Sequence, residues 1–214
     1  MKIAIVTINL NNKTGLERTI QSVISQTYKD YQYIIIDGDS TDGSKEIINQ
    51  YKQYLSYYIS EPDKGIYNAM NKALPYITAE YTLFLNSGDF LHTNTILTDI
   101  VQYLNEDIVY GDLLIHKANG NTFTKQYDKT PTEKYFLNDT LPHQASFVKT
   151  TLIQQYKYRE DYNIISDWIF FYETITKHKA TYKHIPTIIA DFHLGGISSD
   201  TIMLRKEKYK YYNE

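Results

Sequence analysis

The chain has 214 residues, of which 42% are hydrophobic and 22% are charged, and its formal net charge is −3 at pH 7. These values fit one soluble α/β domain and exclude an overall electrostatic attraction to nucleic acid, and no apolar run approaches the roughly 20 residues that span a bilayer. The absence of cysteine excludes disulfides, thiolate catalysis and cysteine metal sites, and it is consistent with a reducing compartment.

Predicted strands and helices alternate through the first half. A strand-like run, "KIAIVTI" at 2–8, follows Met1 directly, so we expect no signal peptide and a cytoplasmic location. Thr14 and Glu17 have the spacing of a capping box that opens the first helix. Further strands are predicted at 31–37, 55–60, 81–85 and 107–116. Helical apolar spacing between them predicts a mostly parallel central sheet flanked by helices, with right-handed crossovers.

The second half is less regular. The segment 130–148 contains two prolines and predicts an irregular connection with short helix and strand pieces. A helix is predicted over 165–178, capped by Ser166 or Asp167. A strand is predicted over 185–198, ending in a glycine turn.

Polar residues follow the ends of four predicted strands. Because the carboxyl ends of parallel strands meet at one edge of a sheet, these loops are expected to form one binding site. The four groups are Asn9 with Asn11 and Asn12, residues 37–42, residues 61–64, and residues 86–89.

Asp37 ends a very apolar strand, where an unpaired carboxylate is costly, so a nucleotide base or ribose is one candidate partner. The alternative is an ordinary loop between strand and helix, in which Gly38 permits a tight turn and Asp42 or Ser44 caps the helix. Asp39 fits either interpretation. The glycine pattern matches neither G-x-G-x-x-G nor the P-loop, which argues against those phosphate cradles.

Two further aspartates and two histidines also have alternative roles. Asp89 is either a turn residue or cap for a helix near Thr93, or a ligand for Mg²⁺ or Mn²⁺, which needs only one or two protein carboxylates beside a diphosphate. Asp167 is either a helix cap or a general base that the helix N-terminus keeps ionised. His143 and His193 are either metal ligands or hydrogen-bonded structural residues, and no H-E-x-x-H pattern favours the first role.

Eight segments between residues 3 and 198 carry a resemblance to a known family. They are "TINLNN", "SVISQTYKDYQYIIIDGDSTDGS", "SEPDKGIYNAMNKAL", "YTLFLNSGDFL", "IVYGDL", "PHQASFV", "ISDWIFF" and "FHLGGIS". On these segments the chain resembles family 2 glycosyltransferases with the GT-A fold, in particular the colanic-acid and capsule-biosynthesis branch. The resemblance implies one α/β domain over 1–198, with a nucleotide-sugar-binding half (1–115) and an acceptor-side half (116–198).

The resemblance also implies roles for individual residues. Contacts to the donor nucleotide sugar are expected from Thr7, Asn9, Asp37, Asp39, Asp63, Lys64, Gly65, Tyr67, Asn68, Asn71, Asn86, Ser87 and Gly88. Asp89 is expected to bind the Mg²⁺ or Mn²⁺ ion, and Asp167 falls on the base of inverting members. The acceptor side is expected to include His143, Gln144, Trp168 and His193.

Two positions depart from the family's pattern. Gly38 stands where many relatives have a second aspartate, so base contacts are expected to shift onto Asp37 and backbone groups. Asn86 replaces the first carboxylate of the DxD-type metal motif, which leaves Asp89 as the expected ligand. The Q-x-x-R-W signature and membrane helices of processive synthases are absent, so transfer of a single sugar is expected.

The expected activity is metal-dependent, inverting transfer of one hexose or N-acetylhexosamine from a UDP-linked donor. The acceptor is expected to be a saccharide or lipid-linked saccharide in bacterial surface-polysaccharide or glycolipid synthesis. The alternatives are a nucleotidyltransferase and a non-catalytic sugar-nucleotide-binding protein with a degenerate site. The basic tail 199–214 is expected to be helical and either to pack on the domain or a partner chain, or to contact the inner face of an anionic membrane.

Overall fold

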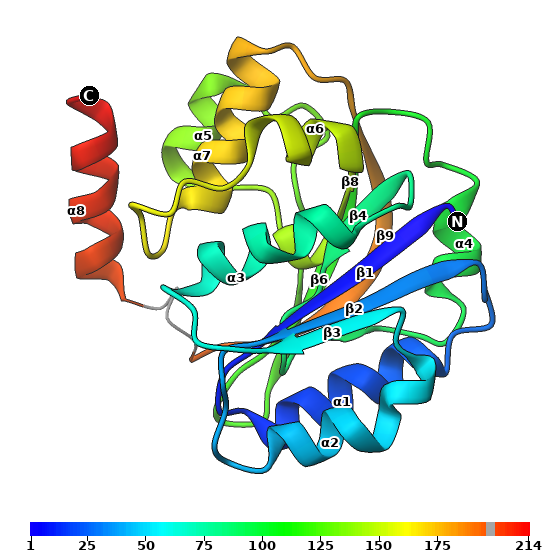
Figure 1. Cartoon of the computed structure of the whole chain (residues 1–214). Helices are drawn as coiled ribbons and strands as arrows, with labels where there is room; N and C mark the ends of the chain where they lie inside the picture. The colour runs from blue at the N-terminus through cyan, green and yellow to red at the C-terminus, as the bar shows by residue number, and fades with distance from the viewer. Residues whose placement is uncertain (196–199) are drawn as a thin grey trace.

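The computed structural model describes residues 1–195 and 200–214 (Figure 1). In this part of the chain, nine strands form one sheet in the order β3-β2-β1-β4-β8-β6-β9-β5, and β7 pairs with β6. The strands are β1 (Ile3–Asn9), β2 (Tyr31–Asp37), β3 (Tyr57–Ser60), β4 (Tyr81–Phe84), β5 (Phe90–Leu91), β6 (Ile108–His116), β7 (Thr122–Lys125), β8 (Ser146–Lys149) and β9 (Tyr182–His193). Strands β1 to β4 pair in parallel, β8 runs antiparallel to β4 and β6, and β6 and β9 are parallel.

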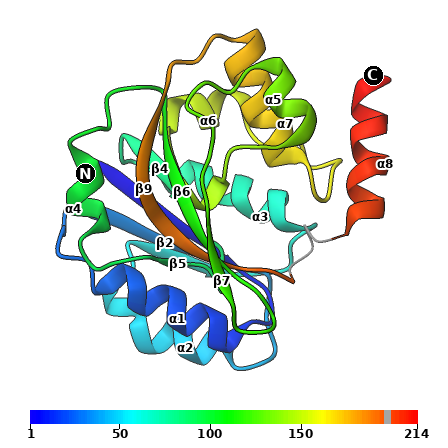
Figure 2. The same cartoon turned by 180° about the vertical axis from the view of Figure 1, so that it is seen from behind.

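Helices cover both faces of the sheet (Figures 1 and 2). Every residue of β1 is buried, which explains why its sequence is a continuous apolar run. Helices α1 and α2 lie on one face, and α3, α6 and α7 lie on the other. The helices are α1 (Lys13–Ile24), α2 (Ser44–Tyr51), α3 (Ile66–Ala73), α4 (Ile96–Val101), α5 (Glu133–Asn138), α6 (Thr150–Tyr156), α7 (Ser166–Tyr172) and α8 (Thr201–Tyr212). Short 3₁₀ turns span Lys52–Tyr54, Leu74–Tyr76 and His143–Ala145, and a π-helical turn spans Glu173–Lys177.

The predicted alternation of strands and helices in the first half is confirmed. Strands β5 and β7 were not predicted, because β5 has two residues and β7 is mostly exposed, so neither shows a buried pattern. The predicted strand at 185–198 instead begins at Tyr182 and ends at His193. Its last three positions, 196–198, lie outside the described residues.

The predicted capping box was wrong. Helix α1 begins one residue before Thr14, and its cap is Asn12, whose Oδ1 accepts a hydrogen bond from the Gly15 amide at 3.2 Å. The Asn12 side chain also donates from Nδ2 to the Ser87 carbonyl at 2.9 Å. This contact, 75 residues away in sequence, favours Asn12 in a way that local spacing cannot reveal.

The predicted caps of α2 and α7 are not the N-caps of these helices. At α2 the N-cap is Gly43, and Asp42 before it accepts from the Ser44 amide at 3.1 Å and from the Lys13 amide at 2.7 Å, so one carboxylate bonds to the first residues of both α1 and α2. At α7 the prediction was wrong, because Ile165 precedes the helix and no side chain of its own caps it.

Helix α8 packs against the domain. Asp200 caps it by accepting from the amides of Ile202 and Met203, both at 3.0 Å. Tyr211 packs edge-on against Trp168 of α7, with ring centroids 5.3 Å apart. The tail thus packs on the domain, and its contact with a membrane stays a prediction. Among the described helices, none has the length and apolar character needed to cross a membrane.

The corrected cap gives a testable difference between two neighbouring positions. Asn12→Ala should lower the free energy of unfolding by about 1 kcal/mol, because it removes a helix cap. Thr14→Ala, at an exposed position inside the helix, should change it little. Urea denaturation of both variants measures the difference, and a larger loss for Thr14→Ala would support the capping box instead.

Candidate functional site

A cavity of about 410 Å³ opens at the edge of the sheet where the parallel strands end. Its walls come from distant parts of the sequence: the loop 86–89 after β4, His143 before β8, and Asp167 at the start of α7. Tyr67 of α3 and His193 at the end of β9 also line the cavity. The sheet therefore brings together residues from both halves of the chain.

Hydrogen bonds on both oxygens hold the Asp167 carboxylate in place. Oδ1 lies 2.9 Å from the Tyr67 hydroxyl and accepts from the Trp168 amide at 2.9 Å. The Tyr67 hydroxyl also lies 2.6 Å from the Ile164 carbonyl oxygen. Burial and the charge of Asp167 raise the pKa of Tyr67 well above its usual value, so this hydroxyl stays protonated and can donate.

His143 connects Asp167 with the loop after β4. Its Nδ1 lies 3.1 Å from Asp167 Oδ2, and its Nε2 lies 3.2 Å from Asn86 Nδ2. Burial lowers the pKa of His143, but the hydrogen bond to Asp167 and the charges of Asp167 and Asp89 outweigh it, so the pKa is raised. With its proton on Nδ1, the ring donates to Asp167 and its Nε2 accepts from Asn86 Nδ2, which leaves Asn86 Oδ1 without a partner.

Asp89 is a buried carboxylate in the wall of the cavity. Burial raises its pKa to about 7, against the attraction of His143 and a hydrogen bond from the His193 amide. The loop around it is fixed by Thr19 of α1, whose hydroxyl donates to the Asp89 carbonyl at 2.6 Å and accepts from the Gly88 amide at 3.0 Å. Gly88 has φ +106°, a conformation that L side chains rarely adopt.

The donor atoms of this loop suit a hard divalent cation. The Asp89 carboxylate lines the cavity, and the buried Asn86 Oδ1 has no hydrogen-bond partner. In residues 1–195 and 200–214, no group of three His, Cys, Asp or Glu side chains is arranged around a single ion position. Mg²⁺ and Mn²⁺ fit such a sparse set when phosphate oxygens and water supply the remaining ligands.

The polar residues at the ends of β1 and β2 bond to one another beneath the rim. Asp37 is fully buried, and its carboxylate accepts from Asn9 Nδ2 at 2.7 Å, from the Ser60 hydroxyl at 2.6 Å, and from the Ser40 amide and hydroxyl at 3.0 and 2.6 Å. Thr7 is also buried, 3.1 Å from the Tyr33 hydroxyl. The protein itself therefore supplies partners for the Asp37 carboxylate, and the contact with a base or ribose stays a prediction.

Asp63 occupies the space beside Gly38. A Cβ at position 38 would lie 2.4 Å from Asp63 Oδ2, so a side chain there would collide with this carboxylate. Asp63 Oδ1 accepts from the Gly65 amide at 2.8 Å, and the residue is half-buried. Where the sequence indicated a missing second aspartate, the structure places the carboxylate of Asp63 instead.

Other predicted donor residues contact the protein away from the cavity. Asn68 and Asn71 donate to Glu160 at 2.8 and 2.9 Å, and Asn71 also donates to the Tyr158 carbonyl, so both tie α3 to the segment 158–160. Lys64 is exposed, and its backbone amide donates to Asn68. Asp39, in the loop after β2, forms an exposed ion pair with Lys45 of α2.

The predicted acceptor-side residues separate into two pairs. His143 and His193 line the cavity. Trp168 is buried, with its Nε1 donating to the Phe136 carbonyl at 2.7 Å, and Gln144 is buried beside His143. Arg18 of α1 was not predicted as a site residue. Its Nη1 lies 3.3 Å from His193 Nε2, so the guanidinium places a positive charge beside this wall of the cavity.

The sequence matches the model of glycosyl transferase family 2 over residues 4–178. The chain belongs to this family. A PGL/p-HBAD biosynthesis glycosyltransferase of Mycobacterium bovis is 26% identical over 213 residues, covering 94% of this chain and 80% of that protein. The Staphylococcus aureus poly(ribitol-phosphate) beta-N-acetylglucosaminyltransferase TarP is 37% identical over 123 residues, which is 54% of this chain and 36% of TarP.

Solved structures confirm the predicted GT-A fold of this glycosyltransferase. S. aureus TarS 1–349 in complex with UDP-GlcNAc superposes with a TM-score of 0.74 at 17% identity, covering 94% of this chain and 61% of that one. Mannosyltransferase PcManGT from Pyrobaculum calidifontis, in complex with GDP-Man and Mn²⁺, gives 0.71 at 14% identity, with 100% and 64% covered. The glycosyltransferase thus spans less than two thirds of either solved chain.

The buried Asp89 makes the stability of the metal-free protein depend on pH. Its folded pKa of about 7 lies above the ordinary 3.8, so the folded protein keeps a proton that the unfolded chain releases. The free energy of unfolding should therefore fall as pH rises from about 4 to about 7, by roughly 1.4 kcal/mol for each pH unit. Asp89→Asn should raise the melting temperature at pH 8 and change it little at pH 4.

Thermal melts in EDTA at the two pH values measure this effect. The exposed carboxylate variant Glu133→Gln is the control and should show no such pH-dependent gain. An Asp89→Asn protein that is less stable than the wild type at pH 8 would show that the ionised carboxylate has a stabilising partner in the fold.

Proposed function

We propose that the chain is an inverting, non-processive glycosyltransferase that transfers one sugar from a UDP-linked donor to an acceptor hydroxyl. The observation that carries this proposal is the Asp167 carboxylate, held by Tyr67 and His143 in the same cavity that Asn86 and Asp89 line. A fixed base on one wall and oxygen ligands for a diphosphate-bound cation on another are the two groups that a single displacement needs.

In the proposed reaction, Asp167 accepts the proton of the acceptor hydroxyl as its oxygen attacks the anomeric carbon. The new glycosidic bond forms while the bond from the anomeric carbon to the diphosphate oxygen breaks, and the nucleoside diphosphate leaves with the bonding electron pair. His143 and Tyr67 orient the carboxylate through the bonds described above. Mg²⁺ or Mn²⁺, held by Asp89 and Asn86, would neutralise negative charge on the leaving diphosphate.

We further propose that the product belongs to bacterial surface-polysaccharide or glycolipid synthesis and that the sugar is a hexose or N-acetylhexosamine. The names of the relatives support this class, since one acts in PGL/p-HBAD biosynthesis and another is a beta-N-acetylglucosaminyltransferase. The complex of TarS with UDP-GlcNAc supports UDP as the carrier, and the complex of PcManGT with GDP-Man and Mn²⁺ makes GDP the comparison to test.

A thermal-shift screen of UDP-GlcNAc, UDP-glucose and GDP-mannose, with and without Mn²⁺, tests donor and metal together. We expect a UDP-sugar to raise the melting temperature more in the presence of Mn²⁺ than in its absence. Product analysis should then show release of UDP. Release of pyrophosphate would identify a nucleotidyltransferase, and binding without any turnover across the panel would identify a non-catalytic binding protein.

Asp167→Asn tests the base directly. General-base catalysis contributes ~10²–10⁴-fold, so turnover measured as UDP release should fall by about that factor. Donor affinity, measured by titration calorimetry, should stay within about twofold, because Asp167 is proposed to act on the acceptor hydroxyl and not to bind the nucleotide. The control is Glu133→Gln, an exposed carboxylate of α5. Turnover like that of the wild type in Asp167→Asn would remove Asp167 from the mechanism.

A further inference from the structure

Glu207 is the buried residue of helix α8, and its carboxylate points into the domain. Oε1 accepts from the Asn163 backbone amide at 2.7 Å and from the Asn163 side chain at 3.2 Å. Oε2 accepts from the backbone amides of Ile164 and Ile165 at 2.9 and 3.2 Å. One side chain from the end of the chain therefore satisfies three consecutive backbone amides more than 40 residues away.

These amides belong to the segment that leads into α7 and carries Asp167. Helix α7 has no side-chain cap of its own, so the entry into the helix is fixed by Glu207 from another element. The carbonyl of Ile164 lies 2.6 Å from the Tyr67 hydroxyl, which in turn lies 2.9 Å from Asp167 Oδ1. Any shift of the segment would move both the carboxylate and the hydroxyl that orients it.

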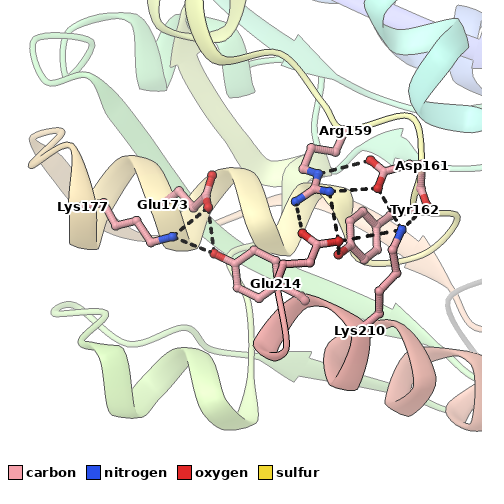
Figure 3. Close-up of polar contacts among 8 residues, drawn as sticks. Arg159, Asp161, Tyr162, Glu173, Lys177, Lys210 and Glu214 are labelled. Atoms are coloured by element: carbon pink, nitrogen blue, oxygen red, sulfur yellow. Dashed lines mark hydrogen bonds and ion pairs between the residues drawn. The ribbon is translucent and has the colours of Figure 1, made fainter.

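A second set of contacts holds the preceding residues to α8 at the surface. Figure 3 shows Glu214 paired with Arg159, and Lys210 paired with Asp161. The Glu214 pair is 2.6 Å long, but its side chains are 37% exposed, and exposed ion pairs contribute little. The buried Glu207 carboxylate is the stronger determinant, because losing it would leave buried amides without partners.

We infer that Glu207 is a positioning residue for Asp167, so that α8 holds the proposed base in its catalytic position. The inference rests on the proposed function. The chemistry of the contact also explains why the residue is a carboxylate. Four N–H groups converge on its two oxygens, and the glutamine amide would direct two further donors at the amides of Ile164 and Ile165.

Glu207→Gln is therefore the discriminating variant, since it keeps the size of the side chain and removes one acceptor oxygen. We expect kcat for UDP release from UDP-GlcNAc with Mn²⁺ to fall about 10- to 100-fold, because small misplacement of a catalytic group has effects of this size. The dissociation constant of UDP should stay within about twofold. The matched control is Lys206→Gln on the exposed side of α8, which should retain wild-type kcat.

The outcomes separate the inference from the proposed function. If the wild type releases no nucleoside diphosphate from any donor of the panel, the proposed function fails. If the wild type is active and Asp167→Asn is not, but Glu207→Gln matches Lys206→Gln, only the role of Glu207 is overturned. Equal losses of kcat and of UDP affinity would likewise reduce Glu207 to a general structural role and overturn the inference.

A second variant covers the case in which Glu207→Gln does not fold. Glu207→Asp keeps both acceptor oxygens on a side chain one methylene shorter, so it should fold and show a smaller loss of kcat with unchanged UDP affinity. A folded Glu207→Asp protein with wild-type kcat would overturn the inference. Circular dichroism and thermal melts establish folding for each variant before kinetics are measured.

Discussion

The hydrogen bond between His143 and Asp167 joins two segments that lie 24 residues apart in the sequence. His143 lies in the irregular connection before β8, and Asp167 is the second residue of α7, which follows β8 and α6. The other nitrogen of His143 reaches Asn86 in the loop after β4. Without this imidazole, no described hydrogen bond would connect Asp167 on one wall of the cavity with Asn86 on the other. The proposed chemistry depends on the distance between those walls.

Burial sets the electrostatics around this bond. Asp89 is removed from water and has no fixed cation beyond His143, so the free protein keeps its negative charge at a cost. A cation and a diphosphate would supply what the fold leaves out. The cavity thus combines a carboxylate with hydrogen bonds on both oxygens, Asp167, and a buried carboxylate whose pKa is raised by burial, Asp89.

How far the sequence predicts this molecule depends on the range of the interactions. The strands and their shared edge follow from local apolar periodicity, and for that reason the edge at which the cavity opens could be predicted. The caps of α1 and α7 could not, since Asn12 is selected by a contact with Ser87 and α7 is held by Glu207. In the same way, the amides of Asn68 and Asn71 are engaged by Glu160, about 90 residues later. Partners at such separations leave no periodic trace in a single sequence.

The contact between Gly38 and Asp63 has a consequence for which side chains this part of the rim can hold. A Cβ at position 38 would lie 2.4 Å from Asp63 Oδ2, so a side chain there would have to displace the Asp63 carboxylate. The loop after β2 and the loop after β3 are therefore coupled through side-chain volume. A larger residue at position 38 would fit more easily together with a smaller residue at position 63.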